Sequence, residues 1–304
     1  MSKLRKIWIL LACIALAVPA CALPGMTAPT PIVLPTPNAT LTAIFEPTAT
    51  GAATVVPTVA PPTPTPTGLV ATLPVTPGAT LDPSKARPNG SPVHAVRLTS
   101  PPTIDGDLSE WSSSIYAVTQ IVYGSGNWTG TADGSASYYI GWDGSALYLA
   151  IGVRDDKHVQ ATTGSKMYLG DDVEIQLDAN LATDLSSTYL SSDDYQLGLS
   201  AGDFGSRPPE AYRWYPSALA GKLSGVTVKA KATADGYVLE AQIPWSTFAL
   251  TPVGGQTLGF ALSLSDNDKT GAAVQQSMIS SVATRKLLNP TTWGTLVLDG
   301  EAGK

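Results

Sequence analysis

The chain has 304 residues, of which only 14 % are charged, and its formal net charge is −6 at pH 7. Three basic residues stand among the first six (Lys3, Arg5 and Lys6); without them 15 basic residues remain against 24 acidic ones, or −9. A chain this acidic lacks the electrostatic footprint of a protein that binds nucleic acid or an anionic membrane surface, so both partner classes are excluded.

Residues 1–21 are predicted to be an export signal. The basic residues precede an apolar run, 7–18, that is too short for a membrane-spanning helix of about 20 residues and is typical of a secretory signal peptide. The Val-Pro-Ala-Cys that follows resembles a bacterial lipobox, so Cys21 is the predicted lipidation site; simple cleavage near Ala20 or Ala22 is the alternative. We therefore expect an exported protein, a cell-surface lipoprotein or a secreted one, that contacts a membrane only through this lipid.

Both cysteines of the chain, Cys13 and Cys21, lie in this first segment. The rest of the chain therefore has no disulfide, no thiolate metal site and no cysteine nucleophile. The residues after position 92 number about 210, which is enough for a hydrophobic core that is stable without disulfides.

Residues 22–92 are predicted to form a disordered stalk rich in proline and threonine. This segment holds 16 of the 25 prolines, in repeated Thr-Pro pairs, and only four charged residues. Each proline removes a backbone donor and restricts the residue before it, so neither a helix nor a sheet can propagate. We expect a polyproline-like tether that reaches roughly 220 Å when fully extended.

Residues 93–304 have the sequence pattern of an all-β domain. Short runs of β-forming residues are separated by Gly, Asp, Asn and Ser, and Asp-Gly turns at 143–144 and 235–236 each join two such runs. Strands are predicted at 93–98, 115–123, 138–142, 146–153, 172–178, 194–200, 226–233, 237–243, 257–265, 277–282 and 293–299. Many short strands at this spacing favour an antiparallel β-sandwich of jelly-roll type.

An ordered series of motifs resembles family 9 carbohydrate-binding modules and their DOMON-like relatives. The motifs are IDGDLSEW (104–111), WD (142–143), LY (147–148), RDD (154–156), GDDVEIQLD (170–178), YVLEAQIPW (237–245), LGF (258–260), DND (266–268) and PTTWGTL (290–296). The resemblance implies a β-sandwich that binds sugars without catalysis, works beside polysaccharide-degrading enzymes such as glycoside hydrolases, and often holds structural calcium.

The resemblance also implies a sugar site. An aromatic residue six positions before a glutamate corresponds to Tyr168 and Glu174 in this sequence. The family's arginine on the next strand and its second stacking tryptophan align near Gly198 and Leu287, so those two side chains are missing.

Other aromatic residues could stack on a sugar, because sugar rings present faces of C–H bonds to flat side chains. Tyr212, Trp214 and Tyr215 are predicted in a proline-flanked loop, and Trp128 in a glycine-rich one. These four residues are further candidates for carbohydrate binding.

Paired carboxylates suggest a hard cation. The candidates Asp171, Asp172, Asp193, Asp194, Asp266 and Asp268 all stand at predicted strand ends, where loop oxygens can converge on structural Ca²⁺. Solvated turn residues are the alternative for any one pair. Zinc is disfavoured, because His94 and His158 are the only histidines.

No recognised catalytic block accompanies the acidic residues, so we expect a non-catalytic module with no organic cofactor. Two alternatives remain open. One is a haem-binding, DOMON-like electron-transfer domain with His158, Met167 or Met278 as axial ligands. The other is a surface adhesion or structural domain without a small ligand.

Overall fold

The computed structural model describes residues 85–300. The predicted signal peptide, Cys21 and most of the predicted stalk lie outside these residues. The strands are β1 (Val93–Arg97), β2 (Tyr116–Val118), β3 (Gln120–Tyr123), β4 (Gly134–Trp142), β5 (Ala146–Asp155), β6 (Asp172–Asp178), β7 (Asp194–Ser200), β8 (Glu210–Tyr215), β9 (Gly221–Lys222), β10 (Thr227–Thr233), β11 (Gly236–Pro244), β12 (Thr257–Asp266), β13 (Ser277–Ser280) and β14 (Gly294–Leu298).

Helical structure in the described residues is limited to short turns. They are η3 (Gly164–Leu169), α3 (Leu181–Asp184), η4 (Ser217–Leu219), η5 (Trp245–Phe248) and η6 (Pro290–Thr292). No helix among residues 85–300 is long and apolar enough to cross a membrane. The predicted all-β class is confirmed.

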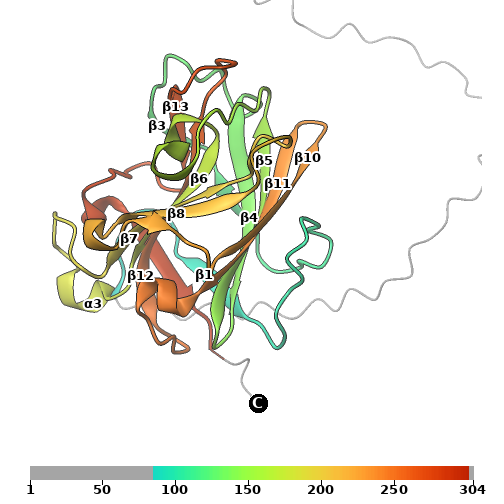
Figure 1. Cartoon of the computed structure of the whole chain (residues 1–304). Helices are drawn as coiled ribbons and strands as arrows, with labels where there is room; N and C mark the ends of the chain where they lie inside the picture. The colour runs from blue at the N-terminus through green and yellow to red at the C-terminus, as the bar shows by residue number, and fades with distance from the viewer. Residues whose placement is uncertain (1–84, 301–304) are drawn as a thin grey trace, which may run out of the picture. The chain divides into compact units, whose positions relative to one another are not determined.

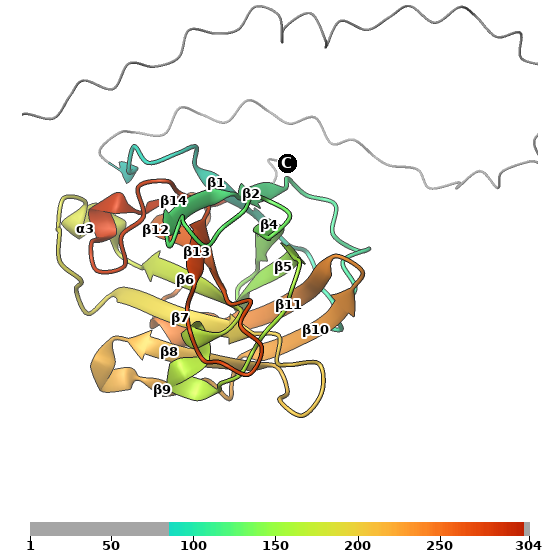
Figure 2. The ribbon, with the colours of Figure 1, turned by 90° about the horizontal axis from the view of Figure 1, so that it is seen from above.

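The strands form two layers, seen in Figures 1 and 2. One layer has the order β10-β11-β5-β4, with β2 on β4, and the other has β14-β12-β6-β7-β8-β9, with β13 on β12 and β3 on β13. Strand β1 joins them, because Val93–Ala95 pair with β14 and Val96–Arg97 pair with β4. Both β1 pairings are parallel, whereas the other strand pairs are antiparallel.

The hydrophobic core lies between the two layers. From β6 it takes Val173, Ile175 and Leu177, and from β5 it takes Leu149 and Ile151, all fully buried. Alternate residues of β6 point to the other face of the sheet. Those residues are buried as well, so the outer face of this layer is covered and carries a polar layer.

Two predictions about the strands need correction. The single strand predicted at 115–123 is two strands, because the chain leaves β4 after Val118 and pairs with β13 from Gln120. The segment at 210–215, predicted as a loop, is strand β8.

The folded part also begins before residue 93. Arg87 is buried, its backbone N–H donates to Thr295 Oγ1 at 2.8 Å, and Asn89 Nδ2 donates to the carbonyls of Thr291 and Trp293. Residues 87–92 therefore belong to the domain and not to the stalk.

Candidate functional site

A pocket of about 380 Å³ lies on the outer face of the β6–β7–β8 layer. Its lining comes from η3, three neighbouring strands, β3, β13 and the segment after β13. The lining residues are Tyr123, Tyr168, Glu174, Gln196, Trp214, Gln275, Met278, Arg285 and Leu287. Three of the six residues predicted for carbohydrate binding, Tyr168, Glu174 and Trp214, thus meet in one cavity.

Two aromatic rings form a corner of this pocket. Tyr168 is 38 % exposed, and its ring meets the Trp214 ring edge-on, with centroids 6.1 Å apart and planes at 79°. Trp214 Nε1 donates to the carbonyl of Ser165 at 2.8 Å, and the Tyr212 ring packs beside the indole at 5.8 Å. The strand β8 and the turn η3 therefore hold each other's aromatic side chains in place.

The other aromatic candidates do not line the pocket, although the Tyr212 ring supports the indole of Trp214. Tyr212 and Tyr215 lie in β8 instead of a loop, and neither lines the pocket. Trp128 does lie in a loop, but its ring packs against the hydrophobic core and its Nε1 donates to the carbonyl of Gly134. Its local setting is that of a packing residue.

A charged pair forms the polar floor of the pocket. Arg285 Nη2 donates to Glu174 Oε2 at 3.0 Å, and the same oxygen accepts from the Nε2 atoms of Gln176 and Gln196, both at 3.2 Å. Burial lowers the pKa of the Arg285 guanidinium, and Glu174 opposes that shift. Because a buried charge is costly unless it is paired, each member of this pair stabilises the charged form of the other.

Several lining residues could not be recognised from the sequence. Arg285 and Glu174 are separated by 111 positions, and no local motif marks the arginine. For Gln196 the sequence indicated only that it lies in a predicted strand. Leu287 lies at the rim and is 38 % exposed, whereas Gly198 is not a lining residue.

Acidic side chains gather at a separate location, at the ends of β5 and β12. Asp133, Asp266 and Asp268 each offer an oxygen within 4.8 Å of the others, and Asp155 and Asp156 do so with Asp268. Asp268 Oδ1 is buried without a hydrogen-bond partner. Burial raises the pKa of Asp266 to about 7, despite the hydrogen bond from Ser277.

A void of about 10 Å³, bordered by Asp155, Asp171 and Asp266, lies beside this group. It has space for roughly one water-sized occupant. The donors here are carboxylate oxygens, which are the ligands that Ca²⁺ prefers. The residues therefore fit a calcium ion.

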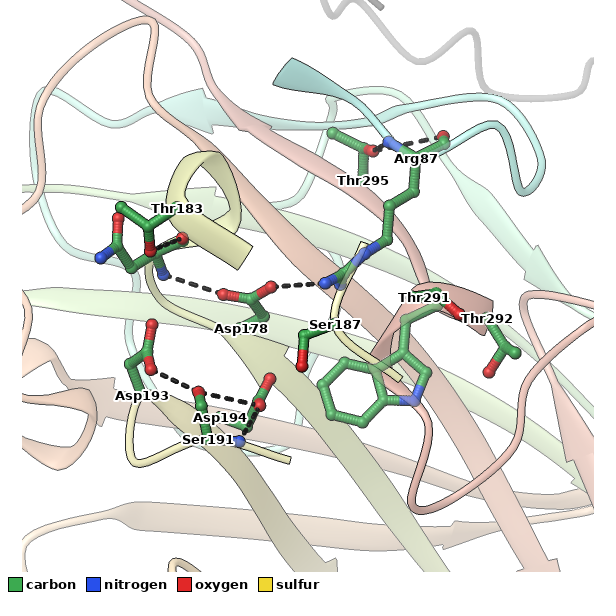
Figure 3. A network of polar contacts seen from close by, with 12 residues as sticks. Arg87, Asp178, Thr183, Ser187, Ser191, Asp193, Asp194, Thr291, Thr292 and Thr295 are labelled. Atoms are coloured by element: carbon green, nitrogen blue, oxygen red, sulfur yellow. Dashed lines mark hydrogen bonds and ion pairs between the residues drawn. The ribbon is translucent and has the colours of Figure 1, made fainter. Parts of the chain in front are cut away.

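A second acidic group surrounds α3, and Figure 3 shows three of its carboxylates, those of Asp178, Asp193 and Asp194. Asp178, Asp184 and Asp193 place one oxygen each within 4.8 Å of the others, and Asp194 Oδ1 is buried without a partner. Arg87 Nη2 donates to Asp178 Oδ2 at 2.7 Å, and burial nevertheless raises the pKa of Asp178 to about 7.

The predicted pair Asp171–Asp172 is divided between two environments. Asp171 accepts hydrogen bonds from the backbone N–H groups of Val159 and Asn267 beside the first acidic group. Asp172 is fully buried near Glu174 and Arg285, has no hydrogen-bond partner, and belongs to neither acidic group. Burial raises the pKa of both carboxyls.

The residues considered for haem ligation are scattered. His158 Nε2 lies 2.8 Å from the carbonyl of Gly202, and the ring packs against Phe204 and Tyr237. Met167 is fully buried, and of the three candidates only Met278 lines the pocket. The described residues therefore place no histidine–methionine pair around this cavity.

Residues 104–301 match the family described as "Carbohydrate family 9 binding domain-like". The chain belongs to this family. The resemblance to family 9 carbohydrate-binding modules is thereby confirmed, and a family of binding domains agrees with the expected non-catalytic module.

Solved structures support the fold. A family 9 carbohydrate binding module from Caldicellulosiruptor kristjanssonii, in complex with cellotriose, aligns with a TM-score of 0.54 and 24 % identity, over 70 % of this chain and 95 % of that one. The same module in complex with glucose aligns equally well over 98 % of its length.

Exoglucanase XynX from Acetivibrio thermocellus is a relative in sequence. It is 25 % identical over 181 residues, which are 58 % of this chain and 14 % of the exoglucanase.

Proposed function

We propose that this protein binds carbohydrate, in the pocket bounded by Tyr168, Trp214, Glu174 and Arg285. The observation that carries the proposal is an aromatic corner directly beside a charged, hydrogen-bonding floor. A sugar ring needs both, since its C–H faces pack on aromatic rings while its hydroxyls exchange hydrogen bonds with polar side chains.

The nature of the glycan is inferred from the relatives. The solved family 9 module holds cellotriose in one structure and glucose in the other, and the similar segment of XynX belongs to an exoglucanase. We infer a β-glucan or its oligosaccharides as the ligand, and glycoside hydrolases acting on the same polymer as neighbours of this protein.

A glycan array followed by calorimetric titration tests the proposal on the full-length protein with calcium present. Trp214→Ala is expected to weaken binding of the best glycan about tenfold or more, since it removes the stacking surface. Tyr189→Ala is the matched control, because Tyr189 is 81 % exposed and does not line the pocket. If the unmodified protein binds no glycan on the array, the proposal fails, and an adhesion or structural domain becomes the better reading.

We also propose a structural calcium ion, held by the first acidic group. Asp133, Asp155, Asp266 and Asp268 would supply its oxygens, next to the small void. The ion would neutralise carboxylates that otherwise repel one another at the ends of β5 and β12. The second acidic group, with Asp193 and Asp194, is a further candidate on the same grounds.

A third proposal concerns the position of the domain in the cell. The signal-like segment 1–21 and the proline-rich segment that follows support an exported protein tethered through a lipid on Cys21. Expression in a bacterial host tests it: the unmodified protein should sediment with membranes, and Cys21→Ser should be released. Release of both forms would instead indicate simple secretion.

A further inference from the structure

The positively charged side chain of the proposed carbohydrate site comes from an unusual place in the chain. Arg285 lies in the segment after β13, reaches back to β6, and is only 9 % exposed. Building on the proposed function, we propose that Arg285, acting as a pair with Glu174, is the hydrogen-bonding group that selects the sugar's hydroxyls. The pair would present a donor and an acceptor side by side to two neighbouring hydroxyls of one ring.

The arginine donates through three nitrogens with unequal partners. Its Nη2 and Nε donate to Glu174 Oε2 and Gln176 Oε1, at 3.0 and 3.3 Å. Its Nη1 has Met278 Sδ as partner, at 2.7 Å, and both residues line the pocket. A thioether sulfur is a weak acceptor, so this nitrogen gains more from a hydroxyl oxygen than from its present partner.

The glutamate is unequal in the same way. Three side-chain donors converge on Oε2, from Gln176, Gln196 and Arg285. Oε1 receives no hydrogen bond from the described residues and is not among their fully buried orphan atoms. A lone carboxylate oxygen of this kind readily accepts a hydrogen bond from a hydroxyl, and such charge-assisted hydrogen bonds are about twice as strong as neutral ones.

The packing around Gly198 of β7 explains why the pocket's arginine comes from the segment after β13. Gly198 of β7 lies behind Trp214, and a Cβ there would overlap the indole ring and come within 2.7 Å of Met167 Sδ. No side chain larger than hydrogen fits at that position while Trp214 keeps its place. The indole therefore fills the space in front of β7, and Arg285 is the only arginine among residues 85–300 that lines the pocket.

The closing experiment compares Arg285→Lys with the unmodified full-length protein. Lysine keeps the charge that balances Glu174, but a single ammonium cannot hold the carboxylate and donate to a second oxygen in the fixed geometry of a guanidinium. We expect the affinity for the best glycan on the array to fall about tenfold or more. The melting temperature should fall as well, because the buried Gln176 Oε1 loses a donor, so binding is compared at a temperature at which both proteins are folded.

A series of monodeoxy sugars separates a selecting role from a structural one. The unmodified protein should bind at least one deoxy analogue about tenfold more weakly than the parent sugar, and Arg285→Lys should lose that discrimination. The inference is overturned if the Arg285→Lys variant binds the parent sugar as tightly as the unmodified protein does and still discriminates against the deoxy analogue. An equal loss toward parent and deoxy sugars also overturns it, because it assigns Arg285 a structural role. Failure of the unmodified protein to bind any glycan would instead overturn the proposed function.

Discussion

Glu240 shows how one buried residue fixes the first motif of the family in space. This carboxylate is fully buried, and its Oε2 accepts from the backbone N–H groups of Asp105 and Gly106, at 2.9 and 2.7 Å. Its Oε1 accepts from Trp111 Nε1 at 2.8 Å. Gly106 adopts φ +81°, in the left-handed region that favours glycine. The 104–111 motif is therefore a turn wrapped around a carboxylate of β11.

Replacement of this carboxylate is expected to destabilise the domain. Glu240→Gln places an amide NH₂ where one oxygen accepted, so at least one buried donor loses its partner, at a cost of about 1–3 kcal/mol. The free energy of unfolding from urea denaturation measures it. Glu110→Gln is the control in the same motif, because Glu110 is exposed and accepts only from Thr103 N. Equal effects of the two changes would contradict the assignment.

At the scale of the strands, the sequence predicted strands in which apolar and polar residues alternate. β6 and β7 have the predicted bounds, since apolar residues alternate with polar ones along both. β8 was missed, because Pro208, Pro209 and Pro216 bracket it and resemble loop residues. Proline is tolerated where it stands outside the hydrogen-bonded span, and here the prolines only delimit the strand.

The candidate site was predictable only in part, for a related reason. Glu174 belongs to the 170–178 motif and Tyr168 stands six positions before it, so the family resemblance was enough to find them. Arg285 meets Glu174 through tertiary folding across 111 positions, and an isolated arginine in a loop has no distinguishing pattern. Periodicity also says nothing about how far the outer face of β6 is covered, so the buried polar floor was not expected.

The turn η3 offers a test of how an element positions a sugar-binding side chain. Gln160 is 3 % exposed, and its Nε2 donates to the carbonyls of Met167 and Asp171, both at 3.0 Å. Gln160→Leu leaves the Asp171 carbonyl without a donor and the Met167 carbonyl with only the Gly170 backbone N–H. Both the unfolding free energy and the glycan affinity should therefore fall, the former by about 1–3 kcal/mol. Thermal denaturation and calorimetric titration measure the two effects.

Two neighbours serve as the controls for η3. Tyr168→Ala should lower the affinity alone, because the ring is partly exposed and lines the proposed carbohydrate pocket. Lys166→Ala should change neither quantity, because Lys166 is exposed and does not line the pocket. An unchanged affinity in Gln160→Leu would mean that η3 keeps its position without this anchor.

For the molecule as a whole, the buried carboxylates predict an unusual pH dependence. Burial raises the pKa of Asp178 to about 7, of Asp194 to about 6 and of Asp266 to about 7, whereas an unfolded aspartate titrates near 3.9. The folded state thus binds more protons than the unfolded state between about pH 4 and pH 7. The stability that these groups contribute is fully present below about pH 4 and is lost as the pH rises through 6 to 7.

The metal-free protein should therefore become less stable from pH 5 to pH 7.5. Urea denaturation in the presence of EDTA across this range measures the slope. Carboxyls whose pKa is lowered, such as Asp203 through the hydrogen bond from the Arg207 backbone N–H, titrate below this window and do not offset it. A stability that rises steadily toward pH 7.5 would contradict the prediction.

Calcium should reverse this dependence if the first acidic group holds an ion, because a cation binds the deprotonated carboxylates that destabilise the metal-free state. At a calcium concentration of about 100 times the Kd, the free energy of unfolding is expected to rise by about 2.7 kcal/mol. This gain should be larger at pH 7.5 than at pH 5, where protons compete with calcium for the carboxylates. Asp266→Asn should reduce the gain, whereas Asp235→Asn, at an exposed turn, should leave it unchanged. The absence of any calcium-dependent gain in stability at pH 7.5 would remove the case for a structural ion.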